Sequence, residues 1–134
     1  MKKILLVLVF ALMSGCALVD AYNMAKWDPV EYDKITTIRA HATQYANSCD
    51  DVNSSKIHAD SIAFETQEFL MYSEHVRHNT DGYTAAKALD EIAQGVKNMY
   101  DKEARVSTMF CKLKFTGIAN AANLMQHTIG GRPR

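Results

Sequence analysis

Apolar residues recur at spacings of three and four in four successive segments, and this periodicity constrains the fold more than any other feature of the sequence. In the first segment the apolar stripe consists of Ile35, Ile38, Ala42, Tyr45 and Cys49. No segment competes with the regular alternation of apolar and polar residues that is typical of strands. The sequence therefore predicts an all-α fold.

The other three segments carry comparable stripes, each on one face of an expected helix. The second stripe contains Ile62, Phe69, Ser73 and Val76, widened by Ala63 and Leu70; the third contains Leu89, Ile92, Val96 and Met99; the fourth contains Val106, Phe110, Leu113, Ile118 and Ala121 or Ala122. We expect these stripes to form one shared core.

The first helix has a complete start signal. Asp28 is placed as its N-cap, Pro29 occupies the first helical position, and Glu31 is spaced for a capping box. Trp27 and Tyr32 are spaced to form a hydrophobic staple across the helix start.

Turn residues separate the remaining helices. Residues 50–55 supply a turn and a cap for the second helix, which we expect to end near His78 and Asn79. Residues 80–82 are then expected to turn the chain, and Gly130 and Gly131 to end the fourth helix.

The boundary between the third and fourth helices is open to two interpretations. Residues 101–105 contain neither Gly nor Pro, so residues 83–127 also fit a single helix of roughly 65 Å. A break capped by Ser107 gives four helices of similar length, which favours an up-down four-helix bundle. Three helices with a long last one are the alternative.

Composition limits the function classes. A chain of 134 residues with 48% hydrophobic residues fits one folded domain. Its 15 basic and 15 acidic residues give zero formal charge, so no overall basic field favours nucleic acid.

The first fifteen residues have the pattern of an export signal. Residues 1–3 are basic at two positions, and residues 4–13 are an unbroken apolar run that is too short to cross a bilayer. The following residues, Met13-Ser14-Gly15-Cys16, resemble the lipobox of bacterial lipoproteins, with Met in place of the usual Leu.

This resemblance implies that Cys16 is lipidated and that the signal is removed before it. Three acyl chains would anchor the protein stably. Ala17 follows Cys16, where lipoproteins kept in the inner membrane commonly carry Asp. By this sorting rule, the expected location is the periplasmic face of the outer membrane.

The two remaining cysteines are expected to form a disulfide. Cys49 and Cys111 are an even pair in an oxidising compartment, and the helix pattern places both at the same end of the bundle. The bond would close a loop of roughly 60 residues and stabilise the domain by about 4 kcal/mol.

Residues with catalytic or metal-binding chemistry do not gather into a recognisable motif. His75 and His78 share one face of the second helix beside Glu74, but a metal site needs ligands from other helices, so surface histidines are favoured. The seven methionines are scattered, and the paired acidic residues are expected to be solvated. We therefore expect neither catalysis nor a metal or cofactor.

Charge is distributed unevenly along the chain. All 15 acidic residues precede residue 104, whereas residues 104–134 contain only basic charges. This segment is predicted to bind a partner through Lys112, Lys114, Arg132 and Arg134. Alternatively, the two lysines pair with Asp50 and Asp51 beside the disulfide.

The expected organisation is a signal peptide (1–15), a lipid-anchored tether (16–27), a helical bundle (28–129) and a basic C-terminal tail (130–134). The favoured hypothesis is a non-catalytic outer-membrane lipoprotein that binds an envelope protein, peptidoglycan or lipopolysaccharide. An alternative is a phage-encoded lipoprotein, either an outer-membrane spanin subunit acting in lysis, which a long last helix would favour, or a superinfection-exclusion lipoprotein. A further alternative is a ligand or metal carrier that uses the bundle core.

Overall fold

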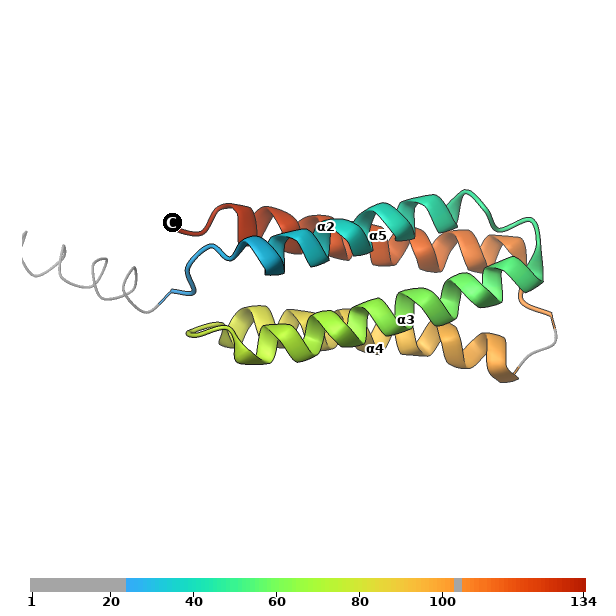
Figure 1. Ribbon diagram of the computed structural model, residues 1–134. Helices are drawn as coiled ribbons and strands as arrows, with labels where there is room; N and C mark the ends of the chain where they lie inside the picture. Colours follow the sequence, from blue (N-terminus) through green and yellow to red (C-terminus); the bar gives the residue numbers. More distant parts are fainter. Residues whose placement is uncertain (1–23, 103–104) are drawn as a thin grey trace, which may run out of the picture.

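The structure is a four-helix bundle. This computed structural model describes residues 24–102 and 105–134; the predicted signal peptide and Cys16 lie outside the described residues. The helices are α2 (Pro29–Ala46), α3 (Val52–His75), α4 (Thr80–Lys102) and α5 (Thr108–Gly130), and the described residues contain no strand. Successive helices run in alternating directions (Figure 1), which confirms the predicted up-down bundle.

A break separates α4 from α5, so the alternative of one helix over residues 83–127 is wrong. Residues 105–107 are not helical, and the Ser107 hydroxyl accepts a hydrogen bond of 3.1 Å from the Phe110 amide. Val106 is buried in the core beside this cap. A satisfied helix start and a buried side chain together stabilise the break.

Helix packing is uneven around the bundle. The most extensive contacts join α2 to α5 and α3 to α4, whereas α4 and α5 are the least extensively packed of the four neighbouring pairs. The core between the helices is filled by apolar side chains, the largest of which include Phe69, Phe115, Ile35, Ile38 and Ile62.

Two residues predicted to lie in the core, Ile92 and Leu113, are instead 44% and 67% exposed. The buried face of α4 is centred one residue further on, at Ala93, and that of α5 includes the fully buried Ala122. The core-facing positions of α4 therefore pass through Ala93, and Ile92 and Leu113 lie outside the buried faces of their helices.

The start of α2 confirms most of the predicted signal. Asp28 Oδ1 accepts hydrogen bonds of 2.8 Å from the amides of Val30 and Glu31, and the rings of Trp27 and Tyr32 lie 6.3 Å apart. The predicted capping-box role of Glu31 is wrong, because its carboxylate is fully buried and bonds to other elements.

The connection between α3 and α4 lies earlier in the chain than predicted. α3 ends at His75, and residues 80–82 form the first turn of α4 rather than a loop. His78 lies in the connection with a φ of 58°, so it does not share a helical face with His75. Asn79 directly precedes α4, and its carbonyl accepts a 2.8 Å bond from the Tyr83 amide.

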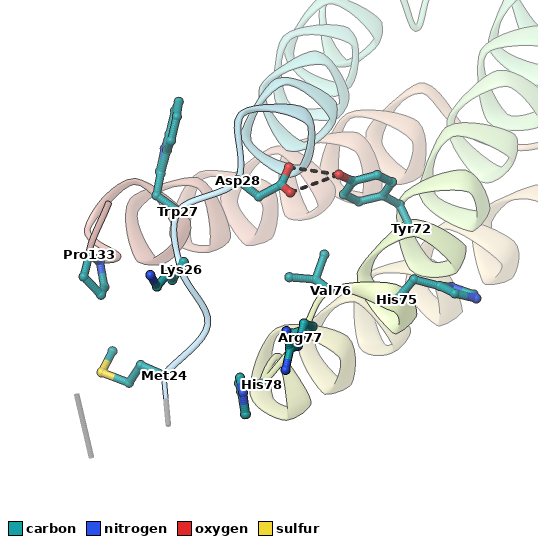
Figure 2. A pocket seen from close by; sticks show the side chains of 10 residues that line it. All are labelled: Met24, Lys26, Trp27, Asp28, Tyr72, His75, Val76, Arg77, His78 and Pro133. Carbon is teal, nitrogen blue, oxygen red and sulfur yellow. Dashed lines mark hydrogen bonds between the residues drawn. The ribbon is translucent and has the colours of Figure 1, made fainter. Parts of the chain in front are cut away.

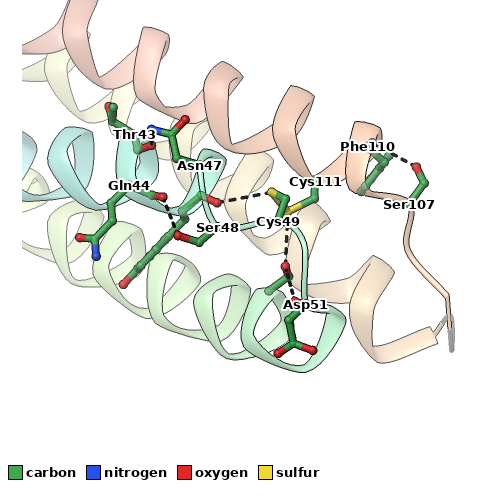
Figure 3. Close-up of a disulfide and its surroundings, with 11 residues drawn as sticks. Thr43, Gln44, Asn47, Ser48, Cys49, Asp51, Ser107, Phe110 and Cys111 are labelled. Atoms are coloured by element: carbon green, nitrogen blue, oxygen red, sulfur yellow. Dashed lines mark hydrogen bonds between the residues drawn. A yellow bond between two sulfur atoms is a disulfide. The ribbon is translucent and has the colours of Figure 1, made fainter.

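The predicted disulfide is present at the opposite end of the bundle (Figure 3). Cys49 and Cys111 are 62 residues apart in the sequence, and their Cα atoms lie 5.8 Å apart. Asp51 caps α3 in the same region through a 2.9 Å bond to the Ser54 amide, as the sequence predicts. The disulfide therefore joins the α2–α3 connection to the first turn of α5.

Candidate functional site

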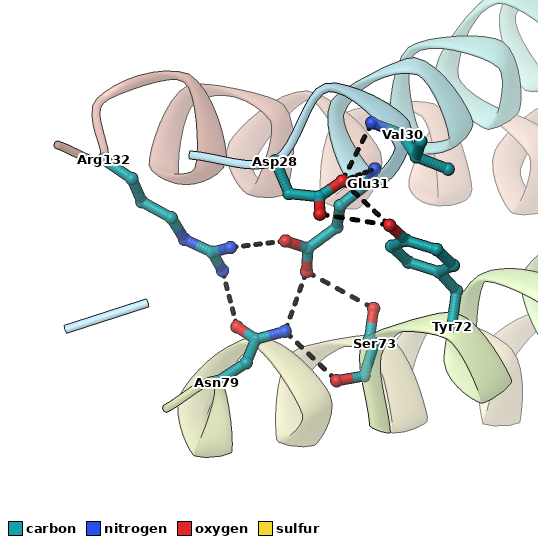
Figure 4. Close-up of polar contacts among 7 residues, drawn as sticks. All are labelled: Asp28, Val30, Glu31, Tyr72, Ser73, Asn79 and Arg132. Atoms are coloured by element: carbon teal, nitrogen blue, oxygen red, sulfur yellow. Dashed lines mark hydrogen bonds and ion pairs between the residues drawn. The ribbon is translucent and has the colours of Figure 1, made fainter. Parts of the chain in front are cut away.

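A buried polar network lies at the end of the bundle that holds the described N-terminal residues and the C-terminus (Figure 4). The Glu31 carboxylate accepts bonds from the Arg132 guanidinium, the Asn79 amide at 2.8 Å and the Ser73 hydroxyl at 3.4 Å. Arg132 also donates to Asn79 Oδ1 at 2.6 Å. The network joins α2, the α3–α4 connection and the C-terminal segment.

Arg132 is thus placed differently from the prediction. It was expected in a basic tail that binds a partner, yet it is 9% exposed and paired with Glu31. A carboxylate that loses all its solvent needs a counter-charge, and Arg132 supplies it. The neighbouring residues also pack back onto the bundle: the Trp27 amide donates to the Pro133 carbonyl at 2.8 Å, and the Arg134 guanidinium lies 4.8 Å from the Trp27 ring.

A hollow of about 730 Å³ lies beside this network, between residues 24–28, which we call the N-terminal linker, and the end of α3 (Figure 2). We call it the linker pocket; it is lined by Met24, Lys26, Trp27, Asp28, Tyr72, His75, Val76, Arg77, His78 and Pro133. The Tyr72 hydroxyl donates to both Asp28 oxygens at 3.0 and 3.1 Å. Desolvation and this bond to Asp28 raise the pKa of Tyr72, so the hydroxyl stays protonated.

A second hollow, of about 660 Å³, lies where α4 begins and α5 ends. Ala85 of α4 and Leu124 of α5 both line it, together with residues of the α3–α4 connection. This shared lining shows which flanks of α4 and α5 face each other.

Hydrogen bonds to other helices fix the opposite flanks. On α4, Asp90 accepts a 2.9 Å bond from Thr66 of α3, and Gln94 donates to the Ala63 carbonyl at 3.0 Å. On α5, Gln126 donates to Thr36 of α2 at 2.9 Å. The flanks of α4 and α5 that lie opposite these bonds, and that line the second hollow, therefore border each other.

These bordering flanks form a largely apolar strip along the bundle. We call it the α4–α5 seam; helical spacing assigns to it Ala85, Ala88, Ile92, Gly95 and Met99 from α4 and Phe110, Leu113, Lys114, Gly117, Ala121 and Leu124 from α5. Asp81, one helical turn before Ala85, lies at the end of the same flank and lines the second hollow, so the strip has an acidic residue at this end. Leu113 and Leu124 are 67% and 69% exposed. Large apolar side chains are therefore uncovered beside two helices that pack less extensively against each other than the other neighbouring pairs do.

Two glycines in the middle of the seam have no packing role within the described residues. A Cβ added at Gly95 or Gly117 would have no atom within 4 Å. Glycine inside a helix costs roughly 1 kcal/mol relative to alanine, so neither helix gains stability from it. Because glycine has no side chain, no atoms project from the centre of the seam at these two positions.

An aromatic stack on the α2–α3 side offers less chemistry. Tyr45 lies between His41 and His58, with ring centroids 5.7 and 4.1 Å away, and His41 Nδ1 lies 2.8 Å from Glu65 Oε1. Burial lowers the pKa of His58. The tyrosine ring separates the two imidazoles, and no group of three metal-ligating side chains occurs among the described residues.

The remaining predicted site residues are accessible to different degrees. Lys112 is exposed, and Lys114 is partly covered with its amine 5.3 Å from the Phe110 ring. The predicted pairing of these lysines with Asp50 or Asp51 does not occur among the ion pairs of the described residues. Arg134 is exposed beside Trp27.

The prediction missed Glu31 and Asn79 as partners in the polar network, and it missed the seam. A glycine in the first turn of α4 was an available signal: a Cβ at Gly82 would overlap the Asn79 amide oxygen and lie 2.8 Å from Arg132 Nη2. No local pattern indicated that Glu31 would bond to a residue 101 positions away.

Comparison of the chain with known proteins finds no match to a protein family, a curated protein or a solved structure. No helix in the described part is long and apolar enough to cross a membrane.

Proposed function

We propose that this protein is a non-catalytic lipoprotein, anchored through Cys16 at the periplasmic face of the outer membrane, whose bundle binds an envelope partner. The observation that best supports binding is the α4–α5 seam. It combines exposed large apolar side chains with small residues at its centre. Contiguous exposed apolar surface of this kind marks interaction sites.

The shape and chemistry of the seam favour a helical protein segment over peptidoglycan or lipopolysaccharide. A long apolar strip between two antiparallel helices that lie side by side is the surface on which an amphipathic helix packs. Gly95 and Gly117 would let that helix approach closely, and Leu113 and Leu124 would contact its apolar face. Lys114 favours acidic residues along its edge.

The anchor is supported by the lipobox-like Met13-Ser14-Gly15-Cys16 and by an export signal of the expected form. From Cys16 to Met24 the chain reaches at most about 30 Å. The bundle is therefore expected to stay close to its membrane and to bind partners that come there.

The alternatives lose the features that favoured them. A long last helix would favour the spanin interpretation, and α4 and α5 are separate helices. The carrier interpretation required polar groups open to a ligand in the core, whereas Glu31, Ser73 and Asn79 bond to one another and to Arg132. A superinfection-exclusion lipoprotein would also need an envelope partner, so the experiment below would identify its target.

Photo-crosslinking in envelope-bearing cells tests the proposal. A photoreactive residue would replace Leu113 or Leu124 in the seam, and Thr37 on the exposed surface of α2 would be the matched control. We expect one protein adduct from both seam positions, none from Thr37, and loss of the adduct in the Cys16→Ala variant. Adding Lys114→Glu should reduce the yield.

Two results would contradict the proposal in different ways. Equal adducts at Thr37 and the seam positions, or none at the seam, would reject the seam as the binding surface. An adduct that persists in Cys16→Ala would separate binding from the anchor and reject membrane positioning as its requirement.

A further inference from the structure

We propose that the end of the bundle that holds Trp27 and Arg134 rests on the membrane surface, and that the linker pocket receives the phosphate of an anionic phospholipid headgroup. The inference rests on the proposed lipid anchor, and it concerns a surface different from the α4–α5 seam. We argue it from the Lys, Arg and His side chains that line the pocket, from the position of the single tryptophan and from the length of chain between Cys16 and Met24.

Four Lys, Arg or His side chains line the pocket: Lys26, His75, Arg77 and His78. All four residues are exposed, and Lys26 and Arg77 form no ion pair with any described residue. Several cations along the sides of the bundle do have partners, such as Lys34 with Glu68 at 2.7 Å. The linker pocket therefore contains two cations whose charge is not matched by a paired carboxylate.

Asp28 is the one acidic residue among the described residues that line the pocket, and its carboxylate is already engaged. It accepts two amide hydrogen bonds at the start of α2 and the hydroxyl of Tyr72. Its negative charge is thus directed at the helix N-terminus, where the helix dipole stabilises it. An incoming phosphate would meet Lys26 and Arg77 as its charged partners.

His75 has a fixed ring orientation. Its Nδ1 lies 3.0 Å from the Met71 carbonyl, which can only accept, so Nδ1 carries the hydrogen. The Nε2 atom is left without a described partner. In the neutral ring Nε2 can only accept, so the charged donors that a phosphate would meet are Lys26 and Arg77.

Trp27 and Met24 supply the apolar part of a membrane-contacting surface. Trp27 is the single tryptophan of the chain, Met24 is 52% exposed, and the Arg134 guanidinium lies 4.8 Å from the Trp27 ring. Tryptophan with nearby basic residues is the combination found at the headgroup level of membranes.

Chain length selects this end over the disulfide end. The described chain begins at Met24, at most about 30 Å of extended chain from Cys16. α4 has 23 residues and spans about 35 Å. A lipid on Cys16 therefore keeps the linker pocket within about 30 Å of the bilayer, so this end reaches the surface more readily than the disulfide end does.

Fluorescence of Trp27 tests the proposal with the full lipidated protein. The chain would be reconstituted in vesicles of phosphatidylethanolamine, phosphatidylglycerol and phosphatidylcholine, with brominated acyl chains on either the glycerol or the choline lipid. We expect brominated phosphatidylglycerol to quench Trp27 more strongly. Each basic residue near an anionic surface strengthens the interaction about fivefold, so Lys26→Gln and Arg77→Gln should each weaken the lipid preference by that factor.

Lys102→Gln provides the matched control, because Lys102 is exposed at the far end of α4. It should leave the preference unchanged, and circular dichroism should show the same helix content in all variants. Equal quenching by the two brominated lipids would overturn the proposal. So would inorganic phosphate that shifts Trp27 emission in phosphatidylcholine vesicles as phosphatidylglycerol does, because the pocket would then take a free anion.

Failure of the anchor is distinguishable from failure of this inference. An intact mass without acyl groups on Cys16 would contradict the proposed anchor. That same chain would still bind phosphatidylglycerol vesicles, and not phosphatidylcholine vesicles, if the pocket binds anionic headgroups. Absence of such binding would reject the pocket as a lipid site.

Discussion

Glu31 has a fully buried carboxylate whose charge is balanced by Arg132 from the other end of the described chain. Asn79 bonds to both members of the pair, so the amide holds their relative positions. Such an arrangement makes each partner dependent on the other. An unpaired charge at this depth would be strongly unfavourable.

Arg132→Met should therefore lower the free energy of unfolding by about 3–5 kcal/mol, because it leaves the Glu31 charge buried without a partner. Urea unfolding followed by circular dichroism would measure the change. The double variant Glu31→Leu/Arg132→Met should lose much less, since it removes both charges. A single variant as stable as the double variant would show that the ion pair is not what holds Glu31 in place.

The environment of His58 predicts a pH dependence of stability. Burial lowers the pKa of His58 below its usual 6.5, so the unfolded chain takes up a proton at a higher pH than the folded protein does. The free energy of unfolding should then decrease as the pH falls below 6.5 and through the lower pKa of the folded state.

Thermal unfolding at about pH 7 and about pH 5 measures this dependence. His58→Phe keeps a ring stacked against Tyr45 but does not titrate, so its loss of stability over this range should be smaller than that of the unaltered protein. The same loss in both proteins would assign the effect to other groups.

At the scale of the helices, the caps could be predicted from the sequence, but the rotation of each helix about its own axis, which decides the face that is buried, could not. Asp28, Asp51 and Ser107 all cap helices as the sequence indicates, because a cap depends on residues two or three positions away. Ile92 and Leu113 fit apolar stripes equally well, yet lie outside the core. Which of two adjacent stripes is buried depends on the volumes of residues contributed by other helices.

The candidate binding surfaces were difficult to predict for the same reason. Lys112 and Lys114 were identified from charge alone, but the apolar seam beside Lys114 becomes visible only when α4 and α5 are placed next to each other. Arg132 looked like part of a tail because nothing nearby in the sequence indicates the buried Glu31 that it contacts.

Glycines within helices should respond in opposite directions to the same substitution. Gly82→Ala should destabilise the protein because the added Cβ overlaps the Asn79 amide and crowds Arg132. Gly117→Ala should stabilise it by about 1 kcal/mol through helix propensity, since the Cβ meets no described atom. Chemical unfolding of both variants measures the difference, and destabilisation by Gly117→Ala would contradict the open space at that position.

The same Gly117→Ala variant links stability to binding. If a partner helix approaches the seam closely at Gly117, the more stable variant should give less of the Leu113 crosslinked product. An unchanged yield would place the close approach elsewhere.

At the scale of the whole molecule, the bundle is held together at both ends by different chemistry. The Cys49–Cys111 bond joins connection and helix at one end, and the Glu31–Arg132–Asn79 network does so at the other. Between these ends, the helices are held by apolar packing that is weakest between α4 and α5.

Replacing both disulfide cysteines with alanine should lower the free energy of unfolding by about 4 kcal/mol, because the unfolded chain regains the freedom of a long loop. Urea unfolding of the Cys49→Ala/Cys111→Ala variant would measure it, with the reduced unaltered protein as a comparison. Equal stability with and without the bond would show that the remaining packing is sufficient.

The contact between Trp27 and Pro133 has a mechanical consequence. The two chain segments run together at the end of the bundle and are joined by a backbone hydrogen bond and by the Arg134 side chain over the Trp27 ring. A pulling force applied through the N-terminal linker would reach α5 as well as α2, because Arg132 clamps the C-terminal segment to Glu31. Tension is thereby shared between α2 and α5, the first and last helices of the bundle. These two helices form one of the two most extensively packed pairs; α3 and α4 form the other.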